Sequence, residues 1–231
     1  MPLDINSASW LKEPQQRKEN PHIENSNEDH QPFSLPHIQN IILPLIESVY
    51  SKSNGYQLSI GYKAPQFVYG ELYTLFEYYK LFSHSINLKS KSAIFTDLGS
   101  GIGKANLVVA GCFDINKSIG IELIPKMHEH SKKRKNEFVQ RLMKKEAYMP
   151  RIKFFRGNIT RTWEKWKDSD VVFMNCVCWK KNMIEQVTKM LMQLKPGSEV
   201  FSTNPIPALQ LVSRVECKTG WSDSRLFLYS T

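Results

Sequence analysis

The stretch "AIFTDLGSGIGKANLVVAGCF", residues 93–113, decides the fold of this chain. It joins a short apolar run to a second, helix-like apolar run through three glycines at alternate positions, Gly99, Gly101 and Gly103. A buried strand that ends in a glycine-rich turn and leads into a helix is typical of the first unit of an α/β sheet. Because glycine has no Cβ, the backbone there can turn sharply and approach a ligand, so the turn predicts a binding site.

The chain beyond this stretch continues to alternate between strand-like and helix-like segments. Helices are predicted over 104–113, 126–148 and 182–194, and strands over 93–99, 117–123, 151–158, 170–175 and 199–204, with two more around a turn in 214–231. Continuous apolar runs such as "DVVFMN" are typical of central parallel strands. We therefore predict an α/β fold with a doubly wound, mostly parallel, seven-stranded Rossmann-like sheet and an N-terminal helical extension.

The N-terminal third differs in composition from the rest. Residues 1–36 are polar and hold six acidic against three basic residues, which predicts a disordered or wrapping arm. Apolar residues then recur at spacings of three and four from Ile38 to Val49, which predicts an amphipathic helix with a kink or break at Pro44. A further helix is expected within 69–86. We divide the chain into an arm (1–36), a helical cap (37–92) and a core (93–231).

The composition favours an intracellular protein with an anionic partner. The net charge is +9, and the excess of basic residues lies after residue 36, which suits nucleic acid or, alternatively, only solubility. The four cysteines form neither a metal-ligand pattern nor a secreted framework, so we expect reduced core residues. No apolar run of 18 residues and no targeting peptide are found, so no membrane partner is expected.

Two acidic residues define the ligand that the glycine turn would take. Glu122 ends the second predicted strand, where a carboxylate can accept the hydroxyls of a ribose. Asp97 directly precedes the turn, and its charge would repel a pyrophosphate but suit a cation. With Ser100 between the glycines and Asn158 positioned for the adenine amino group, the pattern predicts S-adenosylmethionine as the cofactor, as in class I methyltransferases.

Several motifs in a fixed order resemble the DOT family, the non-SET histone-lysine methyltransferases named for disruption of telomeric silencing. They are "FVYGELY" (67–73), "FTDLGSGIG" (95–103), "GIE" (120–122), "RGN" (156–158), "DVVFMNCVCW" (170–179) and "LKPGSEVFSTNPI" (194–206). The resemblance runs from about residue 65 to the C-terminus. It implies an S-adenosylmethionine-dependent protein-lysine N-methyltransferase that acts on a histone, located in the nucleus.

The resemblance also implies roles for individual residues. Tyr69, Gly70 and Glu71 match a loop that closes over the methionine end of the cofactor, so segment 37–92 would supply both cap and closing loop. Asp97, Gly99, Gly101 and Glu122 match cofactor contacts. Asn175 matches the asparagine beside the transferred methyl group and the target amine, and Trp179 matches an aromatic wall of the lysine channel. The implied catalytic set is Asn175, Tyr69 and Trp179.

Three departures from the family pattern leave two alternatives open. Asn158 and Ile159 stand for Asp and Phe, Leu72 for Thr, and Cys176 for the second residue of an Asn-Asn pair. The alternatives are a methyltransferase of a non-histone protein lysine and a catalytically inactive assembly subunit. The localisation would then be nuclear or cytoplasmic.

Two further stretches bear on partners. Residues 126–153 hold ten Lys/Arg against three acids, which predicts either a nucleic-acid or nucleosome contact or a solvated helix face. His128 and His130 are expected on that face, without a metal role. "NPIP" (204–207) follows the fifth strand and is interpreted as a turn. We expect a monomer and no bound metal.

Overall fold

A computed structural model describes residues 33–51, 74–143, 151–218 and 223–231 of the chain. Most of the predicted arm lies outside the described residues. So does the predicted closing loop with Tyr69, Gly70, Glu71 and Leu72.

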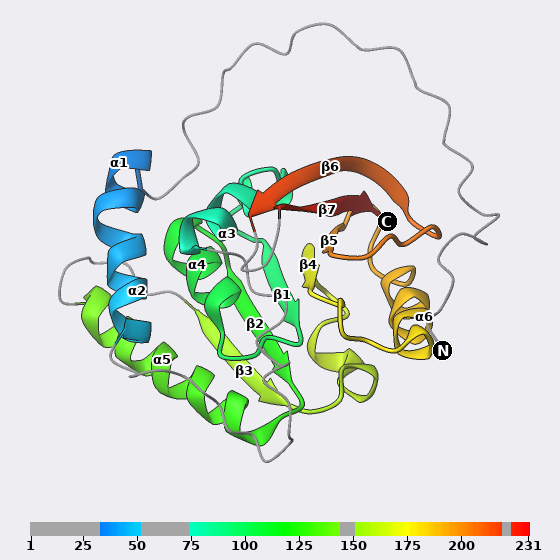
Figure 1. Ribbon diagram of the computed structural model, residues 1–231, viewed down its shortest axis with the longest axis horizontal. Helices are drawn as coiled ribbons and strands as arrows, with labels where there is room; N and C mark the ends of the chain where they lie inside the picture. The colour runs from blue at the N-terminus through cyan, green and yellow to red at the C-terminus, as the bar shows by residue number, and fades with distance from the viewer. Residues whose placement is uncertain (1–32, 52–73, 144–150, 219–222) are drawn as a thin grey trace, which may run out of the picture.

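The described residues form one seven-stranded sheet in the order β3-β2-β1-β4-β5-β7-β6 (Figure 1). Five strands run parallel: β1 (Ile94–Leu98), β2 (Lys117–Glu122), β3 (Ile152–Arg156), β4 (Val171–Met174) and β5 (Glu199–Ser202). β7 (Asp223–Ser230) is antiparallel to β5, and β6 (Gln210–Lys218) is antiparallel to β7. The predicted mostly parallel, doubly wound sheet is confirmed, and its order reverses direction at β1, beside the glycine turn.

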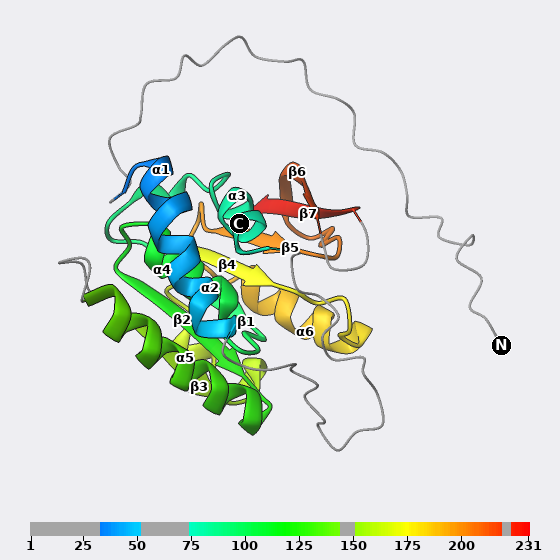
Figure 2. The same cartoon turned by 60° about the vertical axis from the view of Figure 1, so that its left-hand side comes forward.

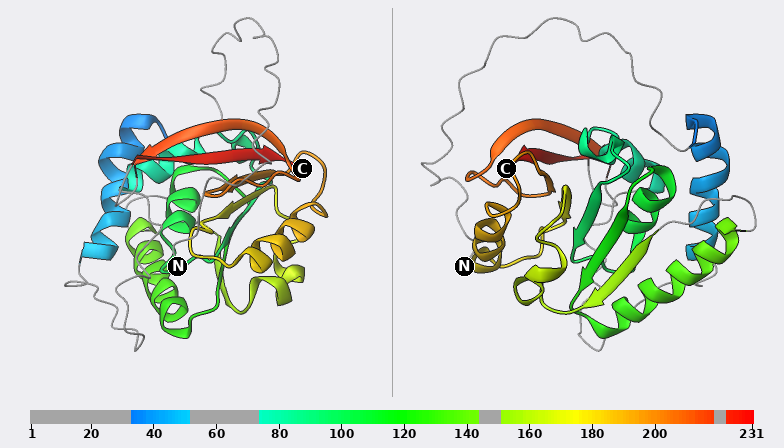
Figure 3. Two further views of the ribbon diagram at one scale, coloured as in Figure 1. Left: turned by 45° about the vertical axis from the view of Figure 1, so that its right-hand side comes forward. Right: turned by 180° about the vertical axis from the view of Figure 1, so that it is seen from behind.

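Helices cover both faces of the sheet (Figures 2 and 3). One face carries α1 (Leu35–His37), a π-helical turn (Ile38–Ile42), α2 (Leu43–Ser51), α3 (Leu75–Phe82), α4 (Lys104–Cys112) and α5 (Pro125–Met143). The other face carries α6 (Lys181–Leu191) and the 3-10 turns Ile159–Arg161 and Trp163–Lys165. A 3-10 turn at Asn87–Lys89 leads from α3 toward β1. The central strand β4 is buried along its whole length because both of its faces are covered.

Pro44 does not break the first helical segment, which continues from Leu35 to Ser51. The predicted irregularity is instead a π-helical turn that ends just before the proline, where the Leu43 N–H donates to the Ile38 carbonyl. Proline has no N–H and crowds the preceding turn, so a locally wider turn is a way to accommodate it. Ile38, Ile42 and Ile46 consequently stay on one buried face.

Two expectations about individual side chains are wrong. Cys112, Cys176 and Cys217 are buried as expected, but Cys178 is exposed because it lies in the turn after β4. His128 is only 7% exposed rather than part of the solvated face of α5. Within the described ranges, no helix is both long and apolar enough to cross a membrane.

Candidate functional site

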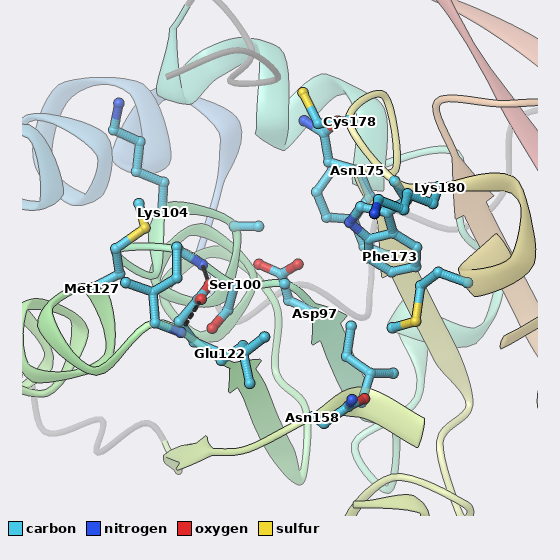
Figure 4. A pocket seen from close by; sticks show the side chains of 18 of the residues that line it. Asp97, Ser100, Lys104, Glu122, Met127, Asn158, Phe173, Asn175, Cys178 and Lys180 are labelled. Atoms are coloured by element: carbon cyan, nitrogen blue, oxygen red, sulfur yellow. Dashed lines mark hydrogen bonds between the residues drawn. The ribbon is translucent and has the colours of Figure 1, made fainter. Parts of the chain in front are cut away.

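A cavity of about 510 Å³ opens at the carboxyl ends of β1, β2 and β4 (Figure 4). Open α/β sheets bind ligands at this edge, next to the point where the strand order reverses. The cavity brings together most of the predicted site residues: Asp97, Gly99, Ser100, Gly101, Glu122, Asn158, Asn175 and Trp179. Sequence reasoning missed other lining residues, among them Tyr78, Lys104, Met127, Phe173, Cys178 and Lys180.

The glycine turn has the backbone conformation that its sequence predicts. Gly99, Gly101 and Gly103 have φ angles of 86°, 53° and 89°, a region that other residues rarely adopt. The N–H groups of Gly99 and Ser100 both donate to the Ile121 carbonyl, at 2.9 and 3.0 Å, which ties the turn to β2. Gly103 does not line the cavity: a Cβ there would lie 2.6 Å from the Phe154 ring, so close packing against β3 requires glycine.

Glu122 is held at the end of β2 with both carboxylate oxygens oriented by backbone. Its Oε2 accepts the Gly101 N–H at 2.8 Å and its Oε1 accepts the Ile124 N–H at 2.7 Å. A carboxylate has about four acceptor positions, so these backbone bonds leave capacity for a ligand hydroxyl. Burial raises the pKa of Glu122, and the backbone donors partly offset this.

Asp97 lies between β2 and β4 with its carboxylate directed into the cavity (Figure 4). It is 4% exposed, and burial together with the charge of Glu122 raises the pKa of Asp97 well above its usual range. Two neighbouring acids in a confined space oppose each other's ionisation. A cationic ligand would offset the cost of ionising them.

Two buried polar atoms of the cavity have no hydrogen-bond partner among the described residues. They are the Ser100 Oγ and the Asn175 Oδ1. Buried polar atoms in folded proteins are nearly always paired, so such atoms at a cavity wall indicate a polar ligand. Asn175 is uncharged, and its oxygen offers an acceptor without adding a further negative charge.

The turn after β4, which presents Asn175, is fastened to the end of β5. Thr203 Oγ1 accepts the Cys176 N–H at 2.9 Å, and the Asn204 side-chain amide donates to the Cys176 carbonyl at 3.3 Å. The same carbonyl also accepts the backbone N–H of Trp179 at 3.0 Å. "NPIP" is therefore a turn, as expected, and its asparagine helps to fix the backbone beside Asn175.

Aromatic side chains wall the cavity near Asn175. The Trp179 ring lies over the glycine turn, since a Cβ at Gly99 would be 3.5 Å from its Cζ2. Phe173 and Tyr78 line the same space from β4 and α3 and pack edge to face at 6.3 Å between ring centroids. In the sequence both residues belong to apolar runs that indicate core, and no local signal separates a cavity wall from core packing.

No group of three or more potential metal ligands is found within the described part of the chain. The Glu122 acceptor sites, the Asp97 carboxylate, the open glycine backbone and the two unpaired oxygens together fit a nucleoside that carries a cationic group, which is the chemistry of S-adenosylmethionine.

The described residues have the fold of S-adenosylmethionine-dependent methyltransferases. Magnesium protoporphyrin IX methyltransferase from Synechocystis PCC 6803 with bound SAM aligns with a TM-score of 0.52 over 84% of this chain and 93% of that chain. Its structure with bound SAH gives a TM-score of 0.50 over 84% and 96%. The sequence identity is 9% in both cases, so the likeness shows the fold alone.

The family follows from sequence. Residues 48–219 match the family described as "Histone methylation protein DOT1", and the chain belongs to this family. The resemblance expected from the motifs is thereby confirmed. A relative from Gibberella zeae, "Histone-lysine N-methyltransferase, H3 lysine-79 specific", is 25% identical over 171 residues. These are 71% of this chain and 34% of the relative, so the chain spans about a third of the length of the curated relative that it matches.

Proposed function

We propose that this chain is an S-adenosylmethionine-dependent protein-lysine N-methyltransferase whose substrate is a histone. The observation that carries the proposal is the unpaired, buried Oδ1 of Asn175 at an aromatic-walled cavity that also holds two carboxylates. Membership of the DOT1 family and the histone-lysine specificity in the name of the Gibberella zeae relative support it. Lysine 79 of histone H3 is the first position to examine.

The residues of the cavity would divide the binding of the cofactor among them. Glu122 would accept the ribose hydroxyls, Asp97 would face the cationic methionine end, and the backbone at Gly99 and Gly101 would pass close beside it. Ser100 Oγ would gain a partner from the ligand. S-adenosylmethionine supplies an electrophilic methyl group on a sulfonium, so what the protein must add is alignment and exclusion of water.

The chain's own residues can prepare a lysine to accept that group. A lysine ammonium must lose its proton first, and burial between aromatic side chains favours the neutral amine. We assign this environment to Trp179 and Phe173. Asn175 would accept a hydrogen bond from the amine through Oδ1 and so direct the nitrogen lone pair toward the methyl group. Tyr69, which lies outside the described residues, remains a predicted member of the catalytic set.

Truncation of Asn175 tests this assignment. Asn175→Ala should lower the rate of labelled-methyl transfer to nucleosomes about 100-fold, because a misaligned acceptor loses most of the benefit of positioning. Calorimetry should show S-adenosylmethionine affinity changed far less. Gln193→Ala is the matched control, since it truncates an exposed amide in the turn after α6 and should leave both quantities unchanged.

Two results would contradict the proposal. Unchanged methyl transfer in Asn175→Ala would remove this residue from the reaction. Absence of S-adenosylmethionine binding to the wild-type chain at high micromolar concentration would instead support an inactive assembly subunit. Running the assay with nucleosomes, free histones and total lysate separates a histone substrate from another protein lysine.

We also propose that α5 contributes to substrate binding in the nucleus. Lys126, Lys132 and Lys133 are exposed along it, and clustered cations attract the phosphates of nucleic acid. Arg134 is only 3% exposed and therefore adds little to this patch, while Lys144 and Lys145 lie outside the described residues. Preference for nucleosomes over free histones in the same assay would support this contact. A monomer remains our expectation.

A further inference from the structure

Asn158 occupies the part of the cavity next to the expected ribose site. It follows β3 directly, and the preceding Gly157 N–H donates to the Glu122 carbonyl at 2.9 Å, so the ends of β2 and β3 lie together. Apolar side chains line the same cavity, among them Ile159, which directly follows Asn158, and Ile124, which follows β2. An apolar space with one polar group beyond a ribose site suits a flat purine base.

The orientation of the Asn158 amide is fixed by its neighbour. Its Oδ1 accepts the Thr160 backbone N–H at 2.9 Å and the Thr160 hydroxyl at 2.9 Å, and it caps the 3-10 turn that begins at Ile159. A backbone N–H can only donate, so the atom facing it must be the amide oxygen. These two bonds use both acceptor positions of Oδ1.

The group left for the cavity is therefore the Asn158 Nδ2, which donates to no described residue. An amide nitrogen carries two hydrogens and has no acceptor capacity. The 6-amino group of adenine is also a donor, so these two groups cannot bond to each other. A ring nitrogen of adenine, or the 6-oxo group of hypoxanthine, is an acceptor and can receive the Nδ2 hydrogen.

We propose that Asn158 donates a hydrogen bond from Nδ2 to the purine of the cofactor. The base site then does not select for the 6-amino group. An aspartate, which the family usually carries here, would keep one oxygen for Thr160 and offer the other to that amino group. Asn158 is thus a specificity-determining residue of this chain. The inference rests on the proposed function, because it assumes that the cavity binds S-adenosylmethionine.

Calorimetry with a matched pair of ligands tests the proposal without any catalytic readout. S-adenosylhomocysteine carries a 6-amino group on its purine, whereas S-inosylhomocysteine carries a 6-oxo group. The two ligands otherwise differ only in the adjoining ring nitrogen, which this exchange affects. The wild-type chain should bind the two within about threefold of each other. Asn158→Asp should prefer the adenine form by about tenfold or more, because its carboxylate accepts from the amino group and repels the 6-oxo group.

The control and the outcomes separate this inference from the proposed function. The aspartate keeps an acceptor for the Thr160 N–H, so the melting temperature without ligand should stay close to that of the wild type. A wild-type preference for the adenine form of tenfold or more, or an unchanged ratio in Asn158→Asp, overturns the inference alone. Failure of the wild-type chain to bind either ligand overturns the proposed function together with it.

Discussion

At the scale of single residues, Asp97 is where binding and stability oppose each other. Its buried carboxylate is unfavourable in the free protein but would pair with a cationic ligand. Asp97→Asn should therefore raise the melting temperature without cofactor and weaken S-adenosylmethionine binding roughly 10- to 100-fold, since bonds to charged groups contribute about 1.5–3 kcal/mol. Thermal unfolding and calorimetry on the same sample check both parts. A lower melting temperature of Asp97→Asn, together with weaker binding, would contradict the prediction that Asp97 favours binding at the expense of stability.

The raised pKa of Asp97 also predicts how the free energy of unfolding changes with pH. The pKa of Asp97 is raised in the folded chain by burial and by Glu122, so the neutral acid favours folding. That contribution is present at low pH and is lost as pH rises from the ordinary value of about 3.9 through the raised pKa. The wild type should lose free energy of unfolding over this range more steeply than Asp97→Asn. The slope does not vanish in the variant, because the pKa of Glu122 is raised too. Equal slopes in urea denaturation series would contradict this account.

At the scale of elements, the alternation of apolar runs predicted every strand of the sheet, but two details did not follow from the sequence. β6 begins at Gln210, four residues before the expected segment, because it pairs with β7 across an irregularity between Leu211 and Ser213. The first residues of β6 are largely exposed, so no apolar alternation marks them. Likewise His128 and Arg134 are buried on α5, where polar residue types suggested solvent. Burial of polar groups depends on tertiary neighbours, which local periodicity does not report.

The position of Asn175 depends on the hydrogen bonds that join Cys176, after β4, to Thr203 and Asn204, after β5. Thr203→Val keeps the shape of the side chain but leaves the Cys176 N–H without its acceptor. We expect a loss of stability of about 1–2 kcal/mol and a fall in kcat of about tenfold, with little change in KM for S-adenosylmethionine. Thr203→Ser restores the acceptor and should restore kcat. Failure of serine to rescue, or a change confined to KM, would show that Thr203 does not act by positioning Asn175.

At the scale of the whole molecule, the helical cap and the sheet share one core, although the sequence suggested separate segments at 37–92 and 93–231. Helix α3 places Phe82 at 0% exposure against three strands. Its ring meets those of Phe95, Phe173 and Phe201 edge to face, with centroids 5.0, 5.4 and 5.6 Å apart. Since Phe173 also lines the cavity, the cap supports the site through a direct contact. Composition alone marks a change of segment but says nothing about whether its apolar faces meet.

This shared core predicts that the described cap and sheet unfold together. Phe82→Ala should lower the free energy of unfolding by about 3–5 kcal/mol, and Phe82→Leu by about 1 kcal/mol, because the larger cavity forfeits more contacts. Three of the five tryptophans, Trp163, Trp166 and Trp179, pack in the core on the opposite face of the sheet, so the fluorescence is weighted toward a region that Phe82 does not touch. In urea denaturation of Phe82→Ala, the fluorescence transition should shift as far as the far-ultraviolet circular dichroism transition. If the fluorescence midpoint stays at the wild-type value while helical signal is lost earlier, the cap folds independently, and its contact through Phe173 does not make it part of the same cooperative unit.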